Sequence, residues 1–396
     1  MSVNPDVVVV GGGPVGLWTA IQGKLLAKDK EFLVIERNEE YERGDIRLHI
    51  EGSSLQTAVS YEPLERLTKS WANKTIPIKD LENDLIKVAH EVGVRTIHQL
   101  ADPSTLQQQY PTAKLILGAD GARSSMREHF FGDQYWFNTP LQYLAQVRYR
   151  ITIPEEKDLE SGSIQKVKSI ANSYIKQVFA GRLVSQTISP EENGEAQVSL
   201  RIFIDQKTYE KMSGANRKHP YYIEKDYNKV PGPLRDTIIR WWGCNQQQQI
   251  IAKAETTQIT AIQLTSYAAE QFTMTQEDGK VVALIGDAAQ GYPFFRAINN
   301  GFLTGTKLAE CIGNAFKQDE AKFSASFRPY VNYAVRRAYV ERISAFVKNL
   351  FVHIANLWLQ ITSFSSIRSV KFKGGIDIEN VRRGTEIWDK LIAVNH

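Results

Sequence analysis

The chain has 396 residues, a net charge of +4 and a hydrophobic fraction of 42%, which provides for a large core and favours two or three domains over one. Its two cysteines, Cys244 and Cys311, are too few and too far apart for a disulfide framework or a thiolate metal cluster. The seven histidines have no paired spacing, so the sequence gives no support to a metal-dependent mechanism. We expect no metal site and no nucleic-acid partner.

The N-terminus leads directly into a β-branched run at residues 6–10, which is typical of a central parallel strand. This leaves no room for a charged region followed by an apolar signal core, so we expect a cytoplasmic protein. Gly11 turns the chain, and Gly13 lets the backbone approach a pyrophosphate. Pro14 and Val15 then open a helix in which Gly16 permits close packing on the strand. The pattern predicts a phosphate site at the helix N-terminus.

The next predicted strand, residues 32–35, ends in Glu36, twenty residues after Gly16. An acidic side chain at this place accepts hydrogen bonds from an adenosine ribose in dinucleotide-binding units. The alternative is a plain βαβ unit whose turn happens to be rich in glycine.

A second glycine motif follows a predicted strand at residues 114–117 and contains Asp120, Gly121 and Arg123. It precedes a helix opened by Ser124 and Ser125. An Asp-Gly pair is most often an ordinary turn and helix cap, so this motif alone carries little weight.

The middle of the chain is predicted to be a block of strands inserted between two halves of a nucleotide-binding domain. Residues 141–153, 177–188, 195–204 and 250–264 have strand patterns, whereas 213–233 has no periodicity and is predicted to be a long surface excursion. The Trp241-Trp242 pair is assigned to a core or an interface.

The third motif follows a buried strand at residues 281–285, where Gly286 and Asp287 turn into a loop containing Pro293. A carboxylate at Asp287 suits the sugar-alcohol chain of a flavin. The three motifs together, in this order, predict one extended FAD.

The C-terminal region carries the chain's positive charge, because residues 328–396 hold eleven Lys or Arg against five acids. Within it, residues 349–367 contain no charged side chain and are flanked by basic residues. Three interpretations stay open: a helix packed on the protein, a helix at a membrane surface and a spanning helix. A basic tail also suits a peripheral membrane or another anionic partner.

The three motifs resemble the fingerprint set of the group A FAD-dependent monooxygenases, which share the p-hydroxybenzoate hydroxylase fold, over residues 6–345. The resemblance implies an α/β protein with a Rossmann-like FAD-binding domain at 1–132 and 281–345. It also implies an inserted, mainly antiparallel β-sheet substrate domain at 133–280 and a helical, basic C-terminal region at 346–396.

The resemblance further implies a set of cofactor-binding residues. It assigns ADP to the first motif and Glu36, both FAD and NAD(P)H to the second motif, and the ribityl chain to Asp287. An arginine after the second strand usually lies along FAD, for which Arg47 is preferred over Arg43. The set is Gly11, Gly13, Pro14, Val15, Gly16, Glu36, Arg37, Arg43, Arg47, Lys79, Asp120, Gly121, Arg123, Gly286, Asp287, Pro293, Asn299, Asn300 and Gly301.

The activity implied by the resemblance is NAD(P)H-driven monooxygenation of an electron-rich aromatic or small organic substrate through a flavin C4a-hydroperoxide. No nucleophile or general base is apparent. Phe294, Phe295 and Arg296 are candidates for the pocket wall, and Arg296 is either a substrate or nicotinamide clamp or a surface residue.

Two departures from the family pattern leave other functions open. Lys79 stands where the family commonly has arginine, and the loop at 290–301 has fewer glycines than its counterparts. A reductase or a redox-inert FAD-binding scaffold is therefore one alternative. Patches at 78–94 and 264–287 also resemble the MICAL-type monooxygenases. The second alternative is therefore the oxidation of protein methionine, as these enzymes perform it.

Overall fold

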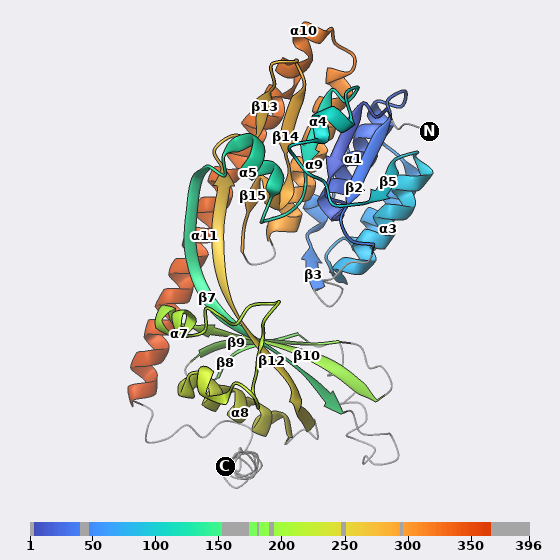
Figure 1. The fold of residues 1–396 in the computed structure, drawn as a ribbon. Helices are drawn as coiled ribbons and strands as arrows, with labels where there is room; N and C mark the ends of the chain where they lie inside the picture. Colours follow the sequence, from blue (N-terminus) through green and yellow to red (C-terminus); the bar gives the residue numbers. More distant parts are fainter. Residues whose placement is uncertain are drawn as a thin grey trace. The chain divides into compact units, whose positions relative to one another are not determined.

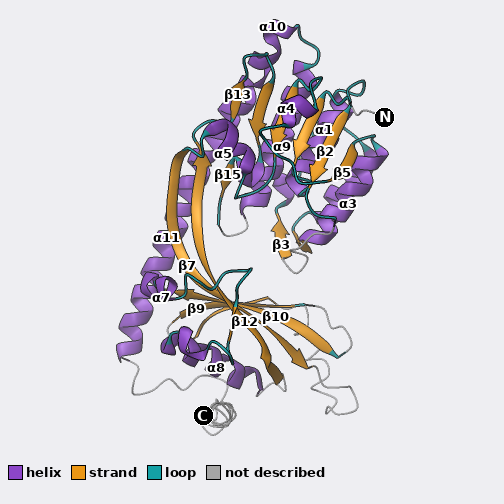
Figure 2. Cartoon of the chain, in the orientation of Figure 1, coloured by secondary structure: helices purple, strands orange, loops and turns teal. Residues whose placement is uncertain are grey.

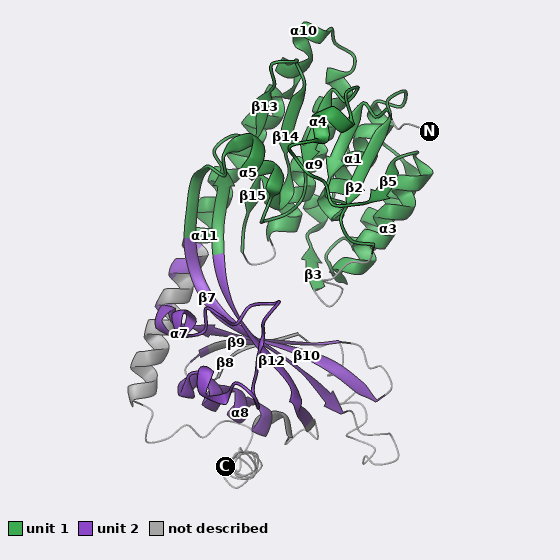
Figure 3. Ribbon diagram, in the orientation of Figure 1, with its two compact units in different colours: residues 1–139, 265–346 green, residues 140–264, 347–396 purple. Residues whose placement is uncertain are grey.

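The computed structural model describes residues 4–39, 47–152, 174–179, 182–189, 194–246, 251–293 and 296–365. They form two compact units, shown in green and purple in Figure 3. Unit 1 comprises residues 1–139 and 265–346, and unit 2 comprises 140–264 and 347–396. Two of the three divisions fall within long strands, β7 (Tyr135–Thr152) and β12 (Ile251–Ala269), and the third falls within the helix α11 (Arg328–Ser365). The predicted boundaries at residues 132 and 280 lie outside both strands.

Unit 1 is built on a sheet with the order β13-β14-β6-β1-β2-β5. Five of these strands run parallel, and β13 is antiparallel to its neighbour β14. The parallel strands, apart from the edge strand β5, are apolar on both faces because helices cover a sheet of this kind on both sides. They are β1 (Val7–Val10), β2 (Phe32–Glu36), β5 (Arg95–His98), β6 (Leu115–Gly118) and β14 (Val281–Leu284), and β13 is Thr273–Thr275.

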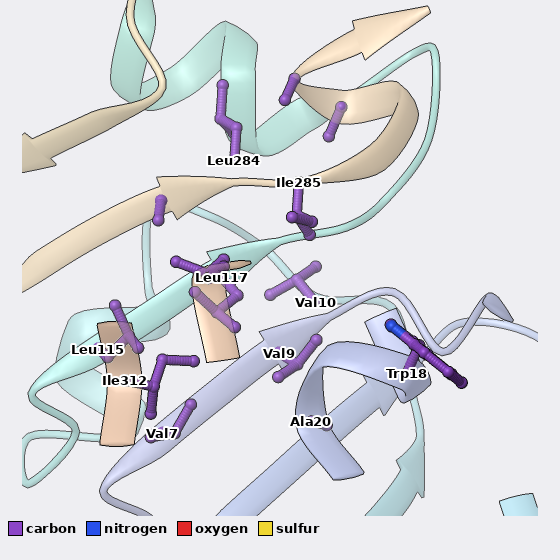
Figure 4. Close-up of a cluster of buried hydrophobic side chains, with 14 of the residues drawn as sticks. Val7, Val9, Val10, Trp18, Ala20, Leu115, Leu117, Leu284, Ile285 and Ile312 are labelled. Carbon is purple, nitrogen blue, oxygen red and sulfur yellow. The ribbon is translucent and has the colours of Figure 1, made fainter. Parts of the chain in front are cut away.

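The core of unit 1 lies between this sheet and its helices. Figure 4 shows side chains of β1, β6 and β14 together with Trp18 and Ile312 in one cluster. Trp18 belongs to α1 (Pro14–Leu26) and Ile312 to α9 (Arg296–Ala315), and both side chains are fully buried. The indole Nε1 of Trp18 donates to the Phe302 carbonyl at 3.1 Å and to Thr306 Oγ1 at 2.9 Å. These contacts fix α1 and α9 to each other.

The other elements of unit 1 include the helices α2 (Glu62–Trp71) and α3 (Ile78–Glu91) and several shorter segments (Figure 1). A two-stranded sheet pairs β3 (Arg47–Ile50) with β4 (Lys74–Pro77). The amphipathic α3 (Ile78–Glu91) leads into β5 and buries Leu81, Leu85 and Val88. The others are η1 (Gly52–Ser54), α2 (Glu62–Trp71), α4 (Leu106–Gln109), α5 (Ser125–Phe131), η4 (Gly286–Ala288), β15 (Gln290–Gly291), α10 (Glu320–Phe323) and η5 (Ser324–Phe327).

Unit 2 contains a second sheet with the order β11-β12-β7-β10-β9-β8, seen with its helices in Figure 2. β10 (Glu195–Ile204) pairs antiparallel with β7 and with β9 (Arg182–Ile188), which in turn pairs with β8 (Tyr174–Phe179). The alternating burial of β10 follows its alternating sequence. The other elements are α7 (Gln206–Lys211), β11 (Tyr221–Tyr222), η3 (Tyr227–Lys229) and α8 (Gly232–Gln246).

The segment at 213–233 differs from the surface excursion expected from its sequence. Ala215, Ile223 and Val230 are buried in the core of unit 2, and β11 pairs with β12. The apolar side chains are too widely spaced to give a periodic signal, although each fills a place in the core. Trp241 is buried as predicted, and its Nε1 donates to Gln186 Oε1 at 2.6 Å.

The last described helix, α11 (Arg328–Ser365), begins in unit 1. Tyr330, Ala334, Ala338 and Glu341 are buried on one side of the helix. A row of large apolar side chains is exposed on it: Val335, Tyr339, Val340, Ile343, Phe346, Val347, Leu350 and Ile354. Among the described residues, no helix combines the length and the apolarity needed to cross a membrane.

Candidate functional site

The three glycine motifs follow three strands that are neighbours in the parallel sheet. β1 lies between β2 and β6, and β6 lies between β1 and β14. Gly11 follows β1, Ala119 follows β6 and Gly286 follows β14 closely, so all three turns lie at the carboxyl edge of the sheet. The strand order reverses between β1 and β6, and ligands of open α/β sheets bind at such a switch point.

The first turn is held in close contact with the second. The N–H of Ala119 donates to the Val10 carbonyl at 2.7 Å. A Cβ added at Gly11, where φ is +110°, would lie 2.3 Å from the Ala119 carbonyl oxygen. A Cβ at Gly16 would lie 2.2 Å from the carbonyl oxygen of Gly11. Only glycine therefore fits at these two positions, as the packing of α1 on β1 requires.

Gly13 differs, because a Cβ added there would have no atom within 4 Å. It is the N-cap of α1, and no described side chain caps the helix. Pro14 has no N–H to donate, and the described residues supply no acceptor for the N–H groups of Gly13, Val15 and Gly16. The positive end of the helix dipole and these donors face open space, which is the arrangement that binds a phosphate group.

A pocket of about 210 Å³ lies beside this turn. Its wall includes Glu36 at the end of β2, Thr96 and His98 from β5, and Leu17 from α1. Glu36 Oε2 accepts the N–H of Gly12 at 2.7 Å and Oε1 accepts the N–H of Asn38 at 3.0 Å. The carboxylate predicted to bind a ribose is thus fixed next to the Gly11–Gly16 turn.

The same pocket contains a residue that the sequence analysis missed. Glu82 on α3 lines the pocket and is only 7% exposed. Burial, and secondly the nearby Glu36, raise the pKa of Glu82 to about 8. Its sequence position gave one signal, since an acidic residue lies among the apolar positions of an amphipathic helix.

The second turn uses its acidic residue as a helix cap. Asp120 Oδ1 accepts the Ser124 hydroxyl at 2.5 Å, and Oδ2 accepts the Ser125 hydroxyl at 3.0 Å and the Met126 N–H at 3.2 Å. Gly121 adopts a φ of +85°, and a Cβ there would meet nothing within 4 Å. The side chain of Arg123 is exposed. Asp120 therefore orders the start of α5.

Arg127 connects the second and third turns and was also missed in the sequence. It is 2% exposed, and its guanidinium donates to the Ala288 carbonyl at 2.9 Å, the Ala122 carbonyl at 3.1 Å and Asp133 at 2.8 Å. Beside it, the hydroxyl of Tyr267 donates to the Asp287 carbonyl at 2.7 Å, and burial raises the pKa of Tyr267. These two side chains hold the carbonyl groups of Asp287 and Ala288, and Asp287 itself is partly exposed.

The residues that follow the third turn are engaged in internal packing. Asn299 Oδ1 accepts the Glu51 N–H at 2.9 Å and the Ser54 hydroxyl at 2.8 Å, while its Nδ2 donates to the His49 carbonyl. The Asn300 side chain accepts from Arg337 at 2.9 Å. A Cβ at Gly301 would lie 2.5 Å from a methyl group of Val15, so this glycine permits α9 to approach α1.

Arg296, at the start of α9, lies in an ion-pair network. It pairs with Glu341, whose side chain is fully buried, and lies 3.6 Å from Glu51. Arg337 also binds this carboxylate, donating to Glu341 Oε1 at 2.6 Å. The predicted pocket clamp is thus bound to a buried carboxylate and joins α9, α11 and the start of η1.

The other predicted positions are distributed around these turns. Arg37 and Lys79 are exposed, and Lys79 lines the pocket of Glu36. Arg47 lies on β3 and is partly buried, and Pro293 is buried. Arg43, Phe294 and Phe295 lie outside the described residues. Among the described residues there is no group of acidic, His or Cys side chains arranged to hold a metal.

Neither a protein-family model nor a curated protein sequence matches the chain. Solved structures do match over nearly its whole length. The tetracycline destructase Tet(51) matches with a TM-score of 0.55 and 15% identity, over 94% of this chain and 100% of that one. The Diels-Alderase PyrE3 of pyrroindomycin biosynthesis matches with a TM-score of 0.55 and 16% identity, over 89% and 78%.

A third similar structure is PqsL, described as a probable FAD-dependent monooxygenase from Pseudomonas aeruginosa. It has a TM-score of 0.51 and 11% identity, over 89% of this chain and 99% of that one. These likenesses show the fold: a parallel Rossmann-like sheet, an antiparallel second sheet and a helical C-terminal region, as found in FAD-dependent monooxygenases. They do not show the likeness to MICAL-type enzymes.

Proposed function

We propose that this protein is an FAD-dependent monooxygenase that uses NAD(P)H to reduce its flavin and oxygenates a small organic substrate. The observation that carries the proposal is the uncapped start of α1 at Gly13, whose free N–H groups face open space beside the Glu36 pocket. This feature lies at the switch point of a fold that includes a probable FAD-dependent monooxygenase.

The residues present fit the adenosine diphosphate half of FAD. Gly13 leaves space for a pyrophosphate, and the N–H groups of Val15 and Gly16 have no described acceptor. Glu36 accepts the N–H of Gly12, next to Gly13, and at this place its carboxylate suits the hydroxyls of a ribose. The adjoining pocket has a volume of about 210 Å³, which we propose to be the space for the purine ring.

FAD, when bound, supplies electron transfer and the activation of dioxygen. The chain's own residues bind and orient it. Asp287 presents a partly exposed carboxylate to the ribityl chain, and Arg127 and Tyr267 hold the backbone of that turn. Arg127 is buried and Tyr267 is partly buried, so the protein itself supports the geometry of the turn. Lys79 adds positive charge at the edge of the adenosine pocket.

An aromatic or other electron-rich compound is the proposed substrate class. A PqsL structure with a TM-score of 0.53 and 12% identity contains 2-aminobenzoylacetate, an aromatic compound, and Tet(51) is described as a tetracycline destructase. Both proteins thus have names that refer to ring-containing compounds, and we propose a substrate of the same class for this chain.

The test measures flavin absorbance first, then NAD(P)H oxidation, and finally the incorporation of oxygen into the product. Purified protein, or protein reconstituted with FAD, is expected to show the visible absorbance of a bound flavin and to consume NADPH or NADH in air. In isotopically labelled dioxygen, the product of an accepted substrate should gain one labelled oxygen atom. Protein that neither carries nor takes up FAD would refute the proposal.

A second candidate is a flavoprotein that performs no oxygenation. PyrE3 is a Diels-Alderase, and a cycloaddition of that kind needs no electron donor. The side chains of Arg296, Asn299 and Asn300 contact the protein itself, which favours a structural role for the segment after the third turn. Holoenzyme that binds FAD tightly but oxidises no NAD(P)H under any substrate would favour this candidate.

A further inference from the structure

Two buried polar groups in the Glu36 pocket have no described partner. Thr96 Oγ1 is buried without a hydrogen bond, and Glu82 makes no hydrogen bond or ion pair with a described residue. Thr96 Oγ1 is enclosed and has lost its hydrogen bonds to water, which costs free energy. The carboxyl oxygens of Glu82 are not fully enclosed, but the residue is only 7% exposed and burial disfavours its charged form. Both groups line the same cavity, so a ligand in that cavity can satisfy them.

The chemistry of the pocket restricts what that ligand is. Leu17 and Ile86 give it apolar walls, whereas Glu82, Asn83 and Thr96 supply polar groups. A flat heteroaromatic ring with hydrogen-bonding edges matches walls of this kind. The pocket adjoins Gly12 and Glu36, so a ring that occupies it is continuous with a ribose at Glu36 and with phosphates at Gly13.

The two carboxyl groups of the pocket have different surroundings. Each oxygen of Glu36 accepts a backbone N–H, from Gly12 or from Asn38. Glu82 accepts none from the described residues, is more deeply buried and faces Glu36, so its pKa is raised to about 8 and it is protonated near neutral pH. A protonated carboxyl has one donor and one acceptor side by side.

We propose that Glu82, as a neutral carboxylic acid, pairs with the Watson–Crick edge of the adenine of a bound dinucleotide. Its O–H donates to adenine N1, and its carbonyl oxygen accepts a hydrogen from the exocyclic amino group. Thr96 Oγ1 gains a partner from the same base. This inference rests on the proposed function for the identity of the whole cofactor, but it requires only an adenosine diphosphate group.

The ionisation of Glu82 then controls how tightly the adenosine half is held. The other titratable groups of the pocket are Glu36 and Glu39 from the end of β2, His98 from β5 and Lys79 from α3. The lining residues of α1 carry no titratable side chain. The interval from about pH 7.5 to about pH 9.5 covers the ionisation of Glu82, and substitutions of Glu82 distinguish its contribution from that of these other groups.

The experiment measures the affinity of the cofactor-free protein for ADP-ribose and for FAD across that interval. ADP-ribose contains the adenosine diphosphate half alone, and none of its groups titrates there. Wild-type affinity for both ligands should fall about tenfold per pH unit once Glu82 ionises, because binding takes up one proton. Glu82→Gln, which keeps one donor and one acceptor, should bind ADP-ribose with an affinity that does not change with pH.

Three further variants make the result specific. Glu82→Leu should bind ADP-ribose at least about tenfold more weakly than Glu82→Gln at every pH, since it loses both hydrogen bonds. Glu91→Gln removes an exposed carboxylate from the same helix and should retain the wild-type pH profile. Thr96→Val should weaken binding without changing the pH profile. Thermal unfolding of each variant checks that the fold is retained.

The outcomes separate this inference from the proposed function. A wild-type affinity for ADP-ribose that is constant with pH, or an equal affinity in the Glu82→Leu variant, would overturn the role of Glu82 while leaving FAD binding intact. Conversely, the predicted profile for ADP-ribose with no uptake of FAD would support Glu82 and refute the flavin assignment. Failure of folded wild-type protein to bind either ligand would overturn both.

Discussion

The first and third glycine turns of unit 1 both follow buried parallel strands, β1 and β14, yet their surroundings differ. At the first turn, the N–H groups of Gly13, Val15 and Gly16 lack described acceptors, and the adjacent pocket contains two buried polar groups without described partners. After the third turn, Asn299 and Asn300 are hydrogen-bonded within the protein. Unsatisfied groups indicate where a ligand binds, whereas satisfied ones indicate how the framework is held.

This difference separates two roles of glycine that a sequence motif does not distinguish. Gly16 and Gly301 are required by neighbouring protein atoms, which would lie 2.2 Å and 2.5 Å from a Cβ added at these positions. Gly13 has no such neighbour, so a methyl group there would meet no protein atom but would occupy the space proposed for a pyrophosphate. The contrast can be tested by adding the same methyl group at each position.

The largest effect is expected for Gly16→Ala. Its methyl group would overlap the Gly11 carbonyl oxygen, which belongs to the backbone and cannot rotate away, so we expect a loss of at least about 4 kcal/mol or a failure to fold. Gly13→Ala should cost about 1 kcal/mol or less, yet reduce FAD affinity at least about tenfold. Denaturant unfolding and FAD titration of both variants measure these effects, and a stable Gly16→Ala protein would contradict the packing assigned to α1.

Removal of the buried carboxylate of Glu341 is expected to have the next largest effect. In Glu341→Ala, Arg296 and Arg337 lose their shared partner, and stability should fall by about 3–5 kcal/mol. Thermal unfolding measures the loss. As a control, Glu310→Ala removes a more exposed ion pair within α9 and should change stability by less than about 1 kcal/mol. If both variants were equally stable, the network around Arg296 would not be structural.

The pH dependence of stability should change in Glu82→Gln. In the native wild type Glu82 holds its proton up to about pH 8, whereas in the unfolded chain it ionises near the ordinary glutamate pKa of 4.5. The native state therefore binds more protons between these values, and stability falls as pH rises through them. Relative to the wild type, Glu82→Gln should gain up to about 4 kcal/mol between about pH 5 and about pH 8. Denaturant unfolding at both pH values detects the gain, and parallel profiles would show that Glu82 is ionised in the native state.

The smallest of these effects is expected at the second turn. Asp120→Asn retains one acceptor but weakens the cap of α5, which should cost about 1 kcal/mol. Because the structure assigns Asp120 to capping, the FAD affinity of the folded variant should change by less than about threefold, in contrast to Gly13→Ala. Isothermal titration measures this affinity, and a loss as large as that of Gly13→Ala would place Asp120 in direct contact with the ligand.

Much of the fold was predictable because strong local signals coincide with tertiary needs. The β-branched run at Val7–Val10 and the Gly11–Gly16 turn specify a parallel strand and its helix, and the alternation of β10 specifies a half-buried strand. The core position of Ile223 was missed, since isolated apolar residues between turns carry no period. The support that Arg127 gives to two turns was also missed, because its partners are backbone carbonyls 5 and 161 residues away.

A buried thiol on α9 provides a measure of motion in unit 1. Cys311 on α9 is a buried free thiol, only 3% exposed, and burial raises its pKa. A thiol reagent reaches such a group only when the surrounding helices separate, so its rate of modification reports the frequency of that opening. With Cys244 replaced by serine, Cys311 is the single cysteine of the chain, and its rate of modification reports how often unit 1 opens around α9.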